Sequence, residues 1–359
     1  MIHRKKTKPI RAGGLIIGGG APISIQSMTN FPIEDTGSTI AQIKRLQEHG
    51  AQIIRIAVNS VNAAAYLKKI RGAVDAVLSA DIHFNHQIAI ESIKAGIDKV
   101  RINPGNIGSA AKVREVVAAA KDYGVPIRIG VNSGSIDRKK YADITPENLA
   151  ASALDHVRIL EDNDFHEIVV SIKSSDIFHT IEANKIFSDL RDYPLHIGLT
   201  EAGYGLNCVV WSTTLISCLL LNGIGDTIRV SMTGDPLEEV ITAQAILEAV
   251  GERQPLIRIV SCPTCGRTDP ELDILGLADA AKVAVTRHFE QKLKNSAKSI
   301  TIAVMGCEVN GPGEASEADF GLAGARGGHL LLFLKGEKIK KVHKNEAIGE
   351  LISEIKKII

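Results

Sequence analysis

Short runs of β-branched residues alternate with longer helical patterns along the first 250 residues, and this alternation limits the possible folds more than any other feature. Eight runs are expected to form strands: Ile23–Met28, Gln52–Val58, Ala80–Phe84, Lys99–Asn103, Pro126–Val131, Glu167–Ile172, Leu195–Leu199 and Thr227–Val230. The expected helices between them include Thr39–Glu48, Val61–Arg71, Ser109–Asp122, Thr145–Asn163, Asp176–Leu190, Leu206–Leu221 and Leu237–Val250. Alternation at this spacing predicts parallel βαβ units.

Eight βαβ units over about 230 residues predict an α/β fold, the (β/α)₈ TIM-type barrel, whose usual length is about 250 residues. An open doubly wound sheet is the alternative. The first strand, however, is not followed by Gly-x-Gly-x-x-Gly, the motif of a dinucleotide-binding sheet. We therefore expect residues 1–250 to form the barrel.

Residues 251–359 are expected to form a second, smaller α+β domain, because the pattern changes after Val250 and Gly251–Pro255 has the composition of a linker. Strands are expected at Leu256–Val260, Ser299–Val304 and Leu330–Leu334, the last followed by a turn at Lys335–Lys338. A helix is expected at Ala278–Lys294. Another is expected after Asn345, where apolar residues recur at helical spacing as in a core-facing helix.

The composition excludes several classes of protein. The net charge is +1 and only 4% of residues are aromatic, so neither nucleic acid nor a membrane surface is an expected partner. The basic N-terminus has no apolar run behind it, and no stretch is long and apolar enough for a transmembrane helix, so we expect a cytoplasmic protein. Five cysteines in such a chain favour reduced thiols or metal ligands over a disulfide framework.

Cations recur at the expected strand ends, where a barrel builds its active site. They are Arg55, Arg101, Arg128, Lys173 and Arg229. Because a lone buried cation is unfavourable and arginine binds two phosphate oxygens at once, these side chains predict a phosphate or diphosphate pocket. Asn103 and Asn132 are placed to donate to the same oxygens. The alternative is internal pairing with carboxylates such as Asp81 and Glu201.

Two histidines and two carboxylates form a second group near the expected strand ends. Asp81 and His83 face the same way on one strand, while His196 and Glu201 lie on and after another. Such a group could hold a divalent metal or perform acid–base chemistry, and either histidine alone is more often a hydrogen-bonded core residue. Glu201 stands out because glycines follow it in a loop at the barrel mouth.

Three cysteines lie in turns of the second domain. Cys262 and Cys265 form a Cys-x-x-Cys pair, and Cys307 is followed by a turn-rich stretch that ends at Glu314. Three soft ligands fit a zinc site completed by His329 or His288, or part of an iron–sulfur site. A thioredoxin-type redox pair is disfavoured because no suitable βαβ motif surrounds it. Cys208 and Cys218 lie in an apolar helical stretch and are expected to be structural.

Five stretches together resemble the 4-hydroxy-3-methylbut-2-enyl diphosphate synthases, iron–sulfur enzymes of the methylerythritol phosphate route to isoprenoids. They are Gln26-Ser27-Met28-Thr29-Asn30, Val100-Arg101-Ile102-Asn103-Pro104-Gly105-Asn106, Gly198-Leu199-Thr200-Glu201-Ala202-Gly203, Ser261-Cys262-Pro263-Thr264-Cys265-Gly266-Arg267 and the stretch Met305–Glu314. The resemblance covers nearly the whole chain, in order, and is of the compact bacterial two-domain type. One loop departs from the family: Asn30–Thr36 lacks the usual Thr-Asn-Thr-Asp, so the resemblance does not extend to the substrate contacts of this loop.

The resemblance implies an oxidoreductase that opens 2-C-methyl-D-erythritol 2,4-cyclodiphosphate reductively. It implies a [4Fe-4S] cluster, in a domain similar to that of sulfite and nitrite reductases, bound by Cys262, Cys265, Cys307 and Glu314. It further implies diphosphate binding by Arg55, Arg101, Asn103, Arg128, Asn132, Lys173 and Ser231, with Glu201 beside the reacting carbons and Asp81 and His196 in support. A flavodoxin or ferredoxin electron donor and a homodimer are also implied.

Two other functions fit the residues without the resemblance. One is a phosphosugar aldolase or epimerase whose second domain is a structural zinc domain. The other is an iron–sulfur sensor that binds phosphometabolites and is not an enzyme.

Overall fold

The computed structural model describes residues 3–296, 298–309, 313 and 316–359. The chain divides into two compact units, Met1–Arg253 and Gln254–Ile359. Each unit has its own hydrophobic core. None of the helices in the described ranges has the length and apolarity needed to span a bilayer.

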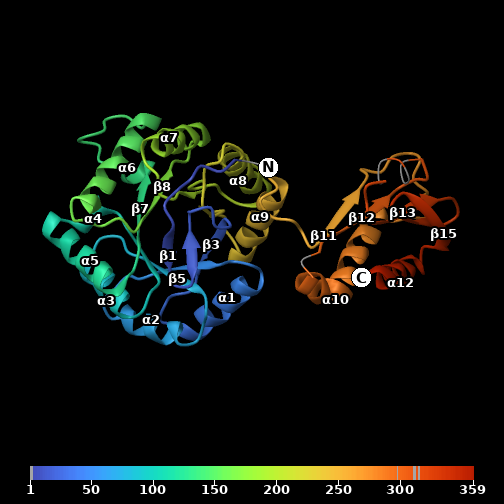
Figure 1. Ribbon diagram of the computed structural model, residues 1–359, viewed down its shortest axis with the longest axis horizontal. Coiled ribbons are helices and arrows are strands. Elements are labelled where there is room, and N and C mark those ends of the chain that lie inside the picture. The colour runs from blue at the N-terminus through green and yellow to red at the C-terminus, as the bar shows by residue number, and fades with distance from the viewer. Residues whose placement is uncertain (1–2, 297, 310–312, 314–315) are drawn as a thin grey trace. The chain divides into compact units, whose positions relative to one another are not determined.

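The first unit is built around an eight-stranded parallel sheet whose strands are each followed by a helix (Figure 1). The strands pair in the order β8-β7-β6-β5-β4-β3-β10-β9, and a parallel bridge between Val170 and Leu195 joins the two edge strands. In chain order they are β3 (Ser24–Met28), β4 (Ile53–Ala57), β5 (Val77–Asp81), β6 (Lys99–Ile102), β7 (Ile127–Asn132), β8 (Ile168–Lys173), β9 (His196–Ile197) and β10 (Thr227–Ile228). The predicted (β/α)₈ barrel is confirmed.

Helices surround the barrel and bury the outward side chains of its strands. They are α1 (Thr36–Glu48), α2 (Ala63–Arg71), α3 (His86–Lys94), α4 (Pro104–Ile107), α5 (Ala110–Tyr123), α6 (Pro146–Glu161), α7 (Ile177–Leu190), α8 (Gly205–Leu221) and α9 (Pro236–Ala249). The side chains of Thr145 and Asp235 accept hydrogen bonds from backbone N–H groups of the first turn, and each is followed by proline. Cap chemistry thus fixes the starts of α6 and α9.

One strand was predicted three residues too late. The expected strand Ala80–Phe84 is β5 at Val77–Asp81, paired with β4 from Ile53 opposite Val77 to Ala57 opposite Asp81. The apolar and polar residues continue to alternate past Asp81, but the chain leaves the ladder there. Asp81 and His83 therefore lie at the strand's carboxyl end, where a barrel carries its site.

A short hairpin closes the barrel at the amino ends of its strands. It consists of β1 (Ile10–Ala12) and β2 (Leu15–Ile17), which pair antiparallel. Ile10 and Ile17 pack on the first inward residues of three strands, Ile53, Val77 and Val169. The bottom of the barrel is therefore apolar and sealed.

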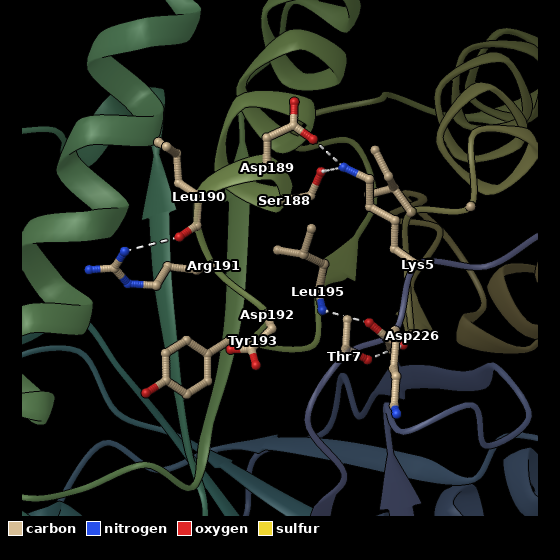
Figure 2. A pocket seen from close by; sticks show the side chains of 14 residues that line it. Lys5, Thr7, Ser188, Asp189, Leu190, Arg191, Asp192, Tyr193, Leu195 and Asp226 are labelled. Atoms are coloured by element: carbon tan, nitrogen blue, oxygen red, sulfur yellow. Dashed lines mark hydrogen bonds and ion pairs between the residues drawn. The ribbon is translucent and has the colours of Figure 1, made fainter.

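A buried aspartate ties the N-terminal segment to the same end of the barrel (Figure 2). One carboxylate oxygen of Asp226 accepts hydrogen bonds from Arg4 at 3.1 Å and from the Thr7 hydroxyl at 3.0 Å. The other oxygen accepts from the backbone N–H of Leu195 at 3.0 Å. Thr7, Leu195 and Asp226 border a cavity of about 520 Å³, at whose rim Lys5 pairs with the exposed carboxylate of Asp189.

We expect Asp226→Ala to destabilise the barrel by about 3 kcal/mol, because it removes the carboxylate that Arg4, Thr7 and the buried Leu195 N–H share as an acceptor. Asp189→Ala removes an exposed ion pair on the same cavity and is expected to change stability by less than about 1 kcal/mol. Urea unfolding of both variants measures the difference. Equal midpoints for the two would contradict a buried network centred on Asp226.

Within its described residues, the second unit is a five-stranded sheet with two helices packed on one face. Its strands follow the order β11 (Ile257–Ser261), β12 (Ile300–Met305), β13 (Phe320–Ala325), β14 (His329–Leu334) and β15 (Glu337–His343). The first three run parallel and the last two continue antiparallel. The helices are α10 (Ile274–Ser296) and α12 (Ala347–Ile358), whose apolar residues share one core with the sheet.

Two of these strands were not predicted. Strand β13 consists largely of glycine and alanine, and a Cβ at Gly321 would lie 1.9 Å from the ring of Phe333. Strand β15 begins inside the expected turn at Lys335–Lys338, because the turn is shorter than expected. Lys335 and Gly336 both have positive φ and form the two-residue loop of a hairpin in which Leu334 is opposite Glu337.

Candidate active site

Five cationic side chains gather inside the barrel near the carboxyl ends of its strands. Arg128 is 2% exposed, and Arg101 and Lys173 are each 7% exposed. The others are Arg55 on β4 and Arg229 directly after β10. Arg101 and Arg128 lie at paired positions of neighbouring strands. A Cβ at Gly130 would lie only 3.2 Å from the Arg101 side chain, so this glycine leaves space for the guanidinium. We call these five residues the cation ring.

Two carboxylates partly balance the cation ring. Asp81 lies 3.2 Å from Arg101 and 3.6 Å from Arg55. Burial by itself would raise the pKa of Asp81, but Arg55, a hydrogen bond from His83 and Arg101 together hold it well below its usual value. Burial lowers the pKa of Arg55 to about 10, although Asp81 opposes the shift. Asp81 is therefore a charged structural partner of the ring.

The second carboxylate comes from helix α9 and was not predicted. Glu239 is 3% exposed, pairs with Arg229 at 3.0 Å and accepts from the Ser27 hydroxyl at 3.0 Å and from the Met232 N–H at 3.1 Å. Glu201, the acid considered for internal pairing, is exposed and makes no ion pair within the described ranges. A helical glutamate that faces a barrel strand leaves no strong signal in the sequence.

Arg128 and Lys173 have no carboxylate partner among the described residues. Arg128 donates to the Ser171 hydroxyl at 3.1 Å, while its Nε and Nη2 atoms are buried without a partner. Burial and then the neighbouring arginines, Arg128 among them, lower the pKa of Lys173 well below its usual value. Burial and then Arg55 likewise lower the pKa of Arg128 well below its usual value. An anion among these side chains would satisfy the open donors and offset the repulsion.

The other residues predicted to bind substrate lie around the ring with different environments. Asn103 caps α4, since its Oδ1 accepts from the Gly105 N–H at 3.1 Å, which leaves its amide NH₂ to donate. Asn132 ends β7 and Ser231 follows β10, and both are half-buried. His196 is fully buried, and neither ring nitrogen has a hydrogen-bond partner in the part of the chain that the structure describes. Its pKa is well below the usual value because of burial and then Lys173, so it is a neutral core residue.

Glu201 lies in the loop after β9 with a strained backbone. Its φ is +56°, which is uncommon for a residue other than glycine, and its side chain is exposed. Strain of this kind costs about 1–3 kcal/mol and is concentrated at functional sites. His83, which follows β5, is half-exposed and lies 3.6 Å from Asp81.

A lysine below the cation ring was not predicted. Lys99 is fully buried, and its Nζ donates to Gln26 Oε1 at 3.2 Å. It stands two residues before Arg101, so strand alternation turns both side chains into the barrel. That spacing was the sequence signal that could have identified it.

In the second unit, two of the predicted metal ligands follow neighbouring parallel strands. Cys262 follows β11 and Cys307 lies two residues after β12, and these strands pair with Ser261 opposite Val304. The Cys262 sulfur accepts from the Gly306 N–H at 3.1 Å. A Cβ at Gly306 would lie 2.4 Å from the Thr268 hydroxyl and 3.4 Å from the Cys262 sulfur, so this turn tolerates no side chain there.

Cys265 is exposed, and hydrogen bonds from the backbone and then the side chain of Arg267 lower its thiol pKa. A lowered pKa and sulfur-directed N–H groups suit thiolate ligands. No group of three His, Cys, Asp or Glu side chains within the described ranges is arranged to hold a metal ion, and that includes His288 and His329. Glu314, the predicted fourth ligand, lies outside the described residues. The donor types and turns fit an iron–sulfur cluster. Cys208 and Cys218 lie on α8 of the first unit.

Known families match both parts of the chain. The GcpE TIM-barrel domain matches residues 7–244, and the GcpE protein C-terminal domain matches residues 258–357. The 4-hydroxy-3-methylbut-2-en-1-yl diphosphate synthase (flavodoxin) of Thermodesulfovibrio yellowstonii is 48% identical over 99% of this chain and 100% of the relative. The protein of the same name from Clostridium perfringens is 47% identical over the same shares.

Among solved structures, dihydropteroate synthases share the barrel fold. The Yersinia pestis protein matches with a TM-score of 0.51 and 16% identity over 68% of this chain and 99% of its own. The Stenotrophomonas maltophilia protein has the same TM-score at 15% identity, over 67% of this chain and 98% of its own. These matches concern the fold alone. The family matches and the full-length relatives establish that the chain belongs to the GcpE family.

Proposed function

We propose that the chain opens the ring of 2-C-methyl-D-erythritol 2,4-cyclodiphosphate reductively and removes a hydroxyl group, giving (E)-4-hydroxy-3-methylbut-2-enyl diphosphate. Its relatives are named as synthases of that product. The observation that carries the proposal is the excess of buried cations over carboxylates in the cation ring. An anionic substrate with two phosphates would supply the missing negative charge.

The barrel side chains bind and orient the diphosphate in this proposal. Arg128 and Lys173 contact it most directly, because neither has a carboxylate partner among the described residues. Asp81 and Glu239 hold Arg55, Arg101 and Arg229 in fixed positions through their ion pairs. The amide of Asn103, Asn132 and Ser231 add neutral contacts at the rim, and His196 supports the ring from below. Preorganised donors of this kind need no rearrangement when the anion enters.

Cys262, Cys265, Cys307 and Glu314 would hold a [4Fe-4S] cluster. When bound, the cluster supplies the two electrons, one at a time, that no amino-acid side chain can provide. The Gly306 N–H donates to the Cys262 sulfur. Hydrogen bonds from Arg267 lower the thiol pKa of Cys265, which favours its thiolate form. We further propose flavodoxin or ferredoxin as the electron donor and a homodimer as the assembly.

Glu201 would act on the reacting carbons, either by donating the proton that leaves with the hydroxyl as water or by positioning that hydroxyl. Its exposed carboxyl and strained backbone support this role.

We expect Glu201→Gln to lower kcat by about 10²- to 10⁴-fold, because it removes an acid–base group without changing the shape of the loop. Pyrophosphate binding should stay unchanged, because Glu201 makes no ion pair with the cation ring. Glu201→Gly tests the backbone strain at this position. Because glycine adopts a φ of +56° without strain, this variant should have a free energy of unfolding up to about 1 kcal/mol higher than the wild type. It should still lose turnover, because the carboxyl group is gone. Wild-type turnover in Glu201→Gln would rule out the proposed role.

The direct experiment is turnover of the cyclodiphosphate by anaerobically reconstituted protein with a strong chemical reductant. Formation of the linear diphosphate, detected by phosphorus NMR, is the expected result. Stoichiometric binding without product would indicate an iron–sulfur sensor instead, and bound zinc in place of iron would indicate the phosphosugar-enzyme alternative.

A further inference from the structure

Buried polar side chains from five strands lie in the barrel between the β1–β2 hairpin and the cation ring. It contains Gln26 on β3, Ser79 on β5, Lys99 on β6, His196 on β9 and Thr227 on β10, each 1% exposed or less. Lys99 is opposite Ser79 in the sheet, and His196 is opposite Thr227. We call these five residues the buried polar layer. Barrel interiors are usually filled by branched apolar residues, so this layer requires an explanation other than packing.

Lys99 is the member of the buried polar layer that carries a basic side chain without a carboxylate partner among the described residues. Its only hydrogen bond within the described ranges is to Gln26 Oε1 at 3.2 Å, and no carboxylate lies within ion-pair distance. Its charged neighbours have the same sign: Arg128 from β7 and Arg55 from β4. His196 from β9 is neutral. Burial, and then these two arginines, lower the pKa of Lys99 well below its usual value.

Gln26 suits a lysine that exists in two protonation states. Its amide oxygen accepts from Lys99, and its Nε2 is buried without a partner. An amide can present its oxygen to an ammonium group or, after a flip, its NH₂ to the lone pair of a neutral amine. A glutamate at this position would instead hold the lysine permanently charged.

We propose that Lys99 is a positioning residue of the anion site, and that it takes up a proton when an anion enters the cation ring above it. The inference rests on the anion-binding part of the proposed function and is independent of the redox chemistry. The bound anion offsets the repulsion from Arg128 and Arg55, so the ammonium form becomes favourable. The extra charge then strengthens the field that holds the anion.

The linkage has a definite sign. The anion raises a pKa that is depressed in the free protein, so between the two pKa values the complex holds more protons than the free protein. Anion affinity must therefore rise as the pH falls through that window. Other groups near the ring, Lys173 and His196, also have lowered pKa values, so a comparison with a Lys99 variant is needed to isolate its share.

Titration calorimetry with inorganic pyrophosphate measures this directly. At one pH, the binding enthalpy in buffers of different ionisation enthalpy gives the number of protons taken up. We expect Lys99→Met to take up about one proton fewer than the wild type and to bind about tenfold more weakly. Lys185→Met, which removes a partly exposed lysine on α7, should match the wild type in both. Changes in the protonation of pyrophosphate itself cancel in the comparison.

The outcomes separate this inference from the proposed function. Binding by both proteins with equal proton uptake overturns the role of Lys99 and leaves the anion site intact. A wild type that does not bind pyrophosphate overturns the anion site, and the Lys99 inference with it. If Lys99→Met does not bind, Lys99→Arg decides: its permanent charge should restore binding without the extra proton, and wild-type proton uptake by that variant would overturn the proposal.

Discussion

Arg128→Met is expected to weaken pyrophosphate binding by at least about 100-fold and, at the same time, to make the ligand-free barrel more stable. The first effect follows because a buried guanidinium with two unpartnered donor atoms is the group best placed to bind two phosphate oxygens. The second follows because an uncompensated buried cation is unfavourable, and an apolar side chain of similar length removes that penalty. We expect a gain of about 1–2 kcal/mol in the free energy of unfolding.

Arg71→Met is the matched control. Arg71 pairs with Asp98 at 2.6 Å and donates to the carbonyl oxygen of Ala76 at 2.7 Å, away from the cation ring. Its loss should therefore destabilise the protein and leave pyrophosphate binding unchanged. Titration calorimetry with pyrophosphate measures binding by both variants, and thermal unfolding without ligand measures their stability. A destabilised Arg128→Met that still binds pyrophosphate would show that the ring is a structural network.

The barrel could be predicted because its signal is repetitive. Eight β-branched runs separated by helical patterns fix the class of fold even when one strand, β5, is misplaced by three residues. Strand β13 was missed because its small residues are required by packing partners that are distant in sequence. Gly321 makes room for Phe333, and Gly324 for the carbonyl of Gly306. Nothing local to the strand shows those requirements.

The cation ring was predicted because its members lie on the barrel strands or directly after one, where alternation and topology together bring side chains to one place. The carboxylates that balance the charge of the ring were not all predicted. Glu239 reaches Arg229 from a helix, and Glu201, which looked like the available acid, is exposed. Lys99 was overlooked because it lies one step deeper than the strand ends. The search for site residues in such a barrel must therefore include every inward-facing residue of a strand, and not only those at its carboxyl end.

Substitution of Cys262, Cys265 or Cys307 by serine is expected to abolish the iron–sulfur absorbance of the anaerobically reconstituted protein and to lower turnover by more than about 10³-fold. A hydroxyl is a poor substitute for thiolate at iron. Cys208→Ser is the control, because Cys208 is buried in the barrel core and its thiol donates to the Ser231 carbonyl, which a hydroxyl can also do. It should keep the iron content of the wild type.

The same three variants also distinguish the roles of the two units. The cation ring lies wholly within Met1–Arg253, so pyrophosphate should bind to Cys262→Ser, Cys265→Ser and Cys307→Ser as it binds to the wild type. Full iron content in any of the three would remove that cysteine from the ligand set. If none of the three variants bound pyrophosphate, anion binding would depend on the cysteines as well. That result would contradict the proposal that one unit binds the anion and the other supplies the electrons.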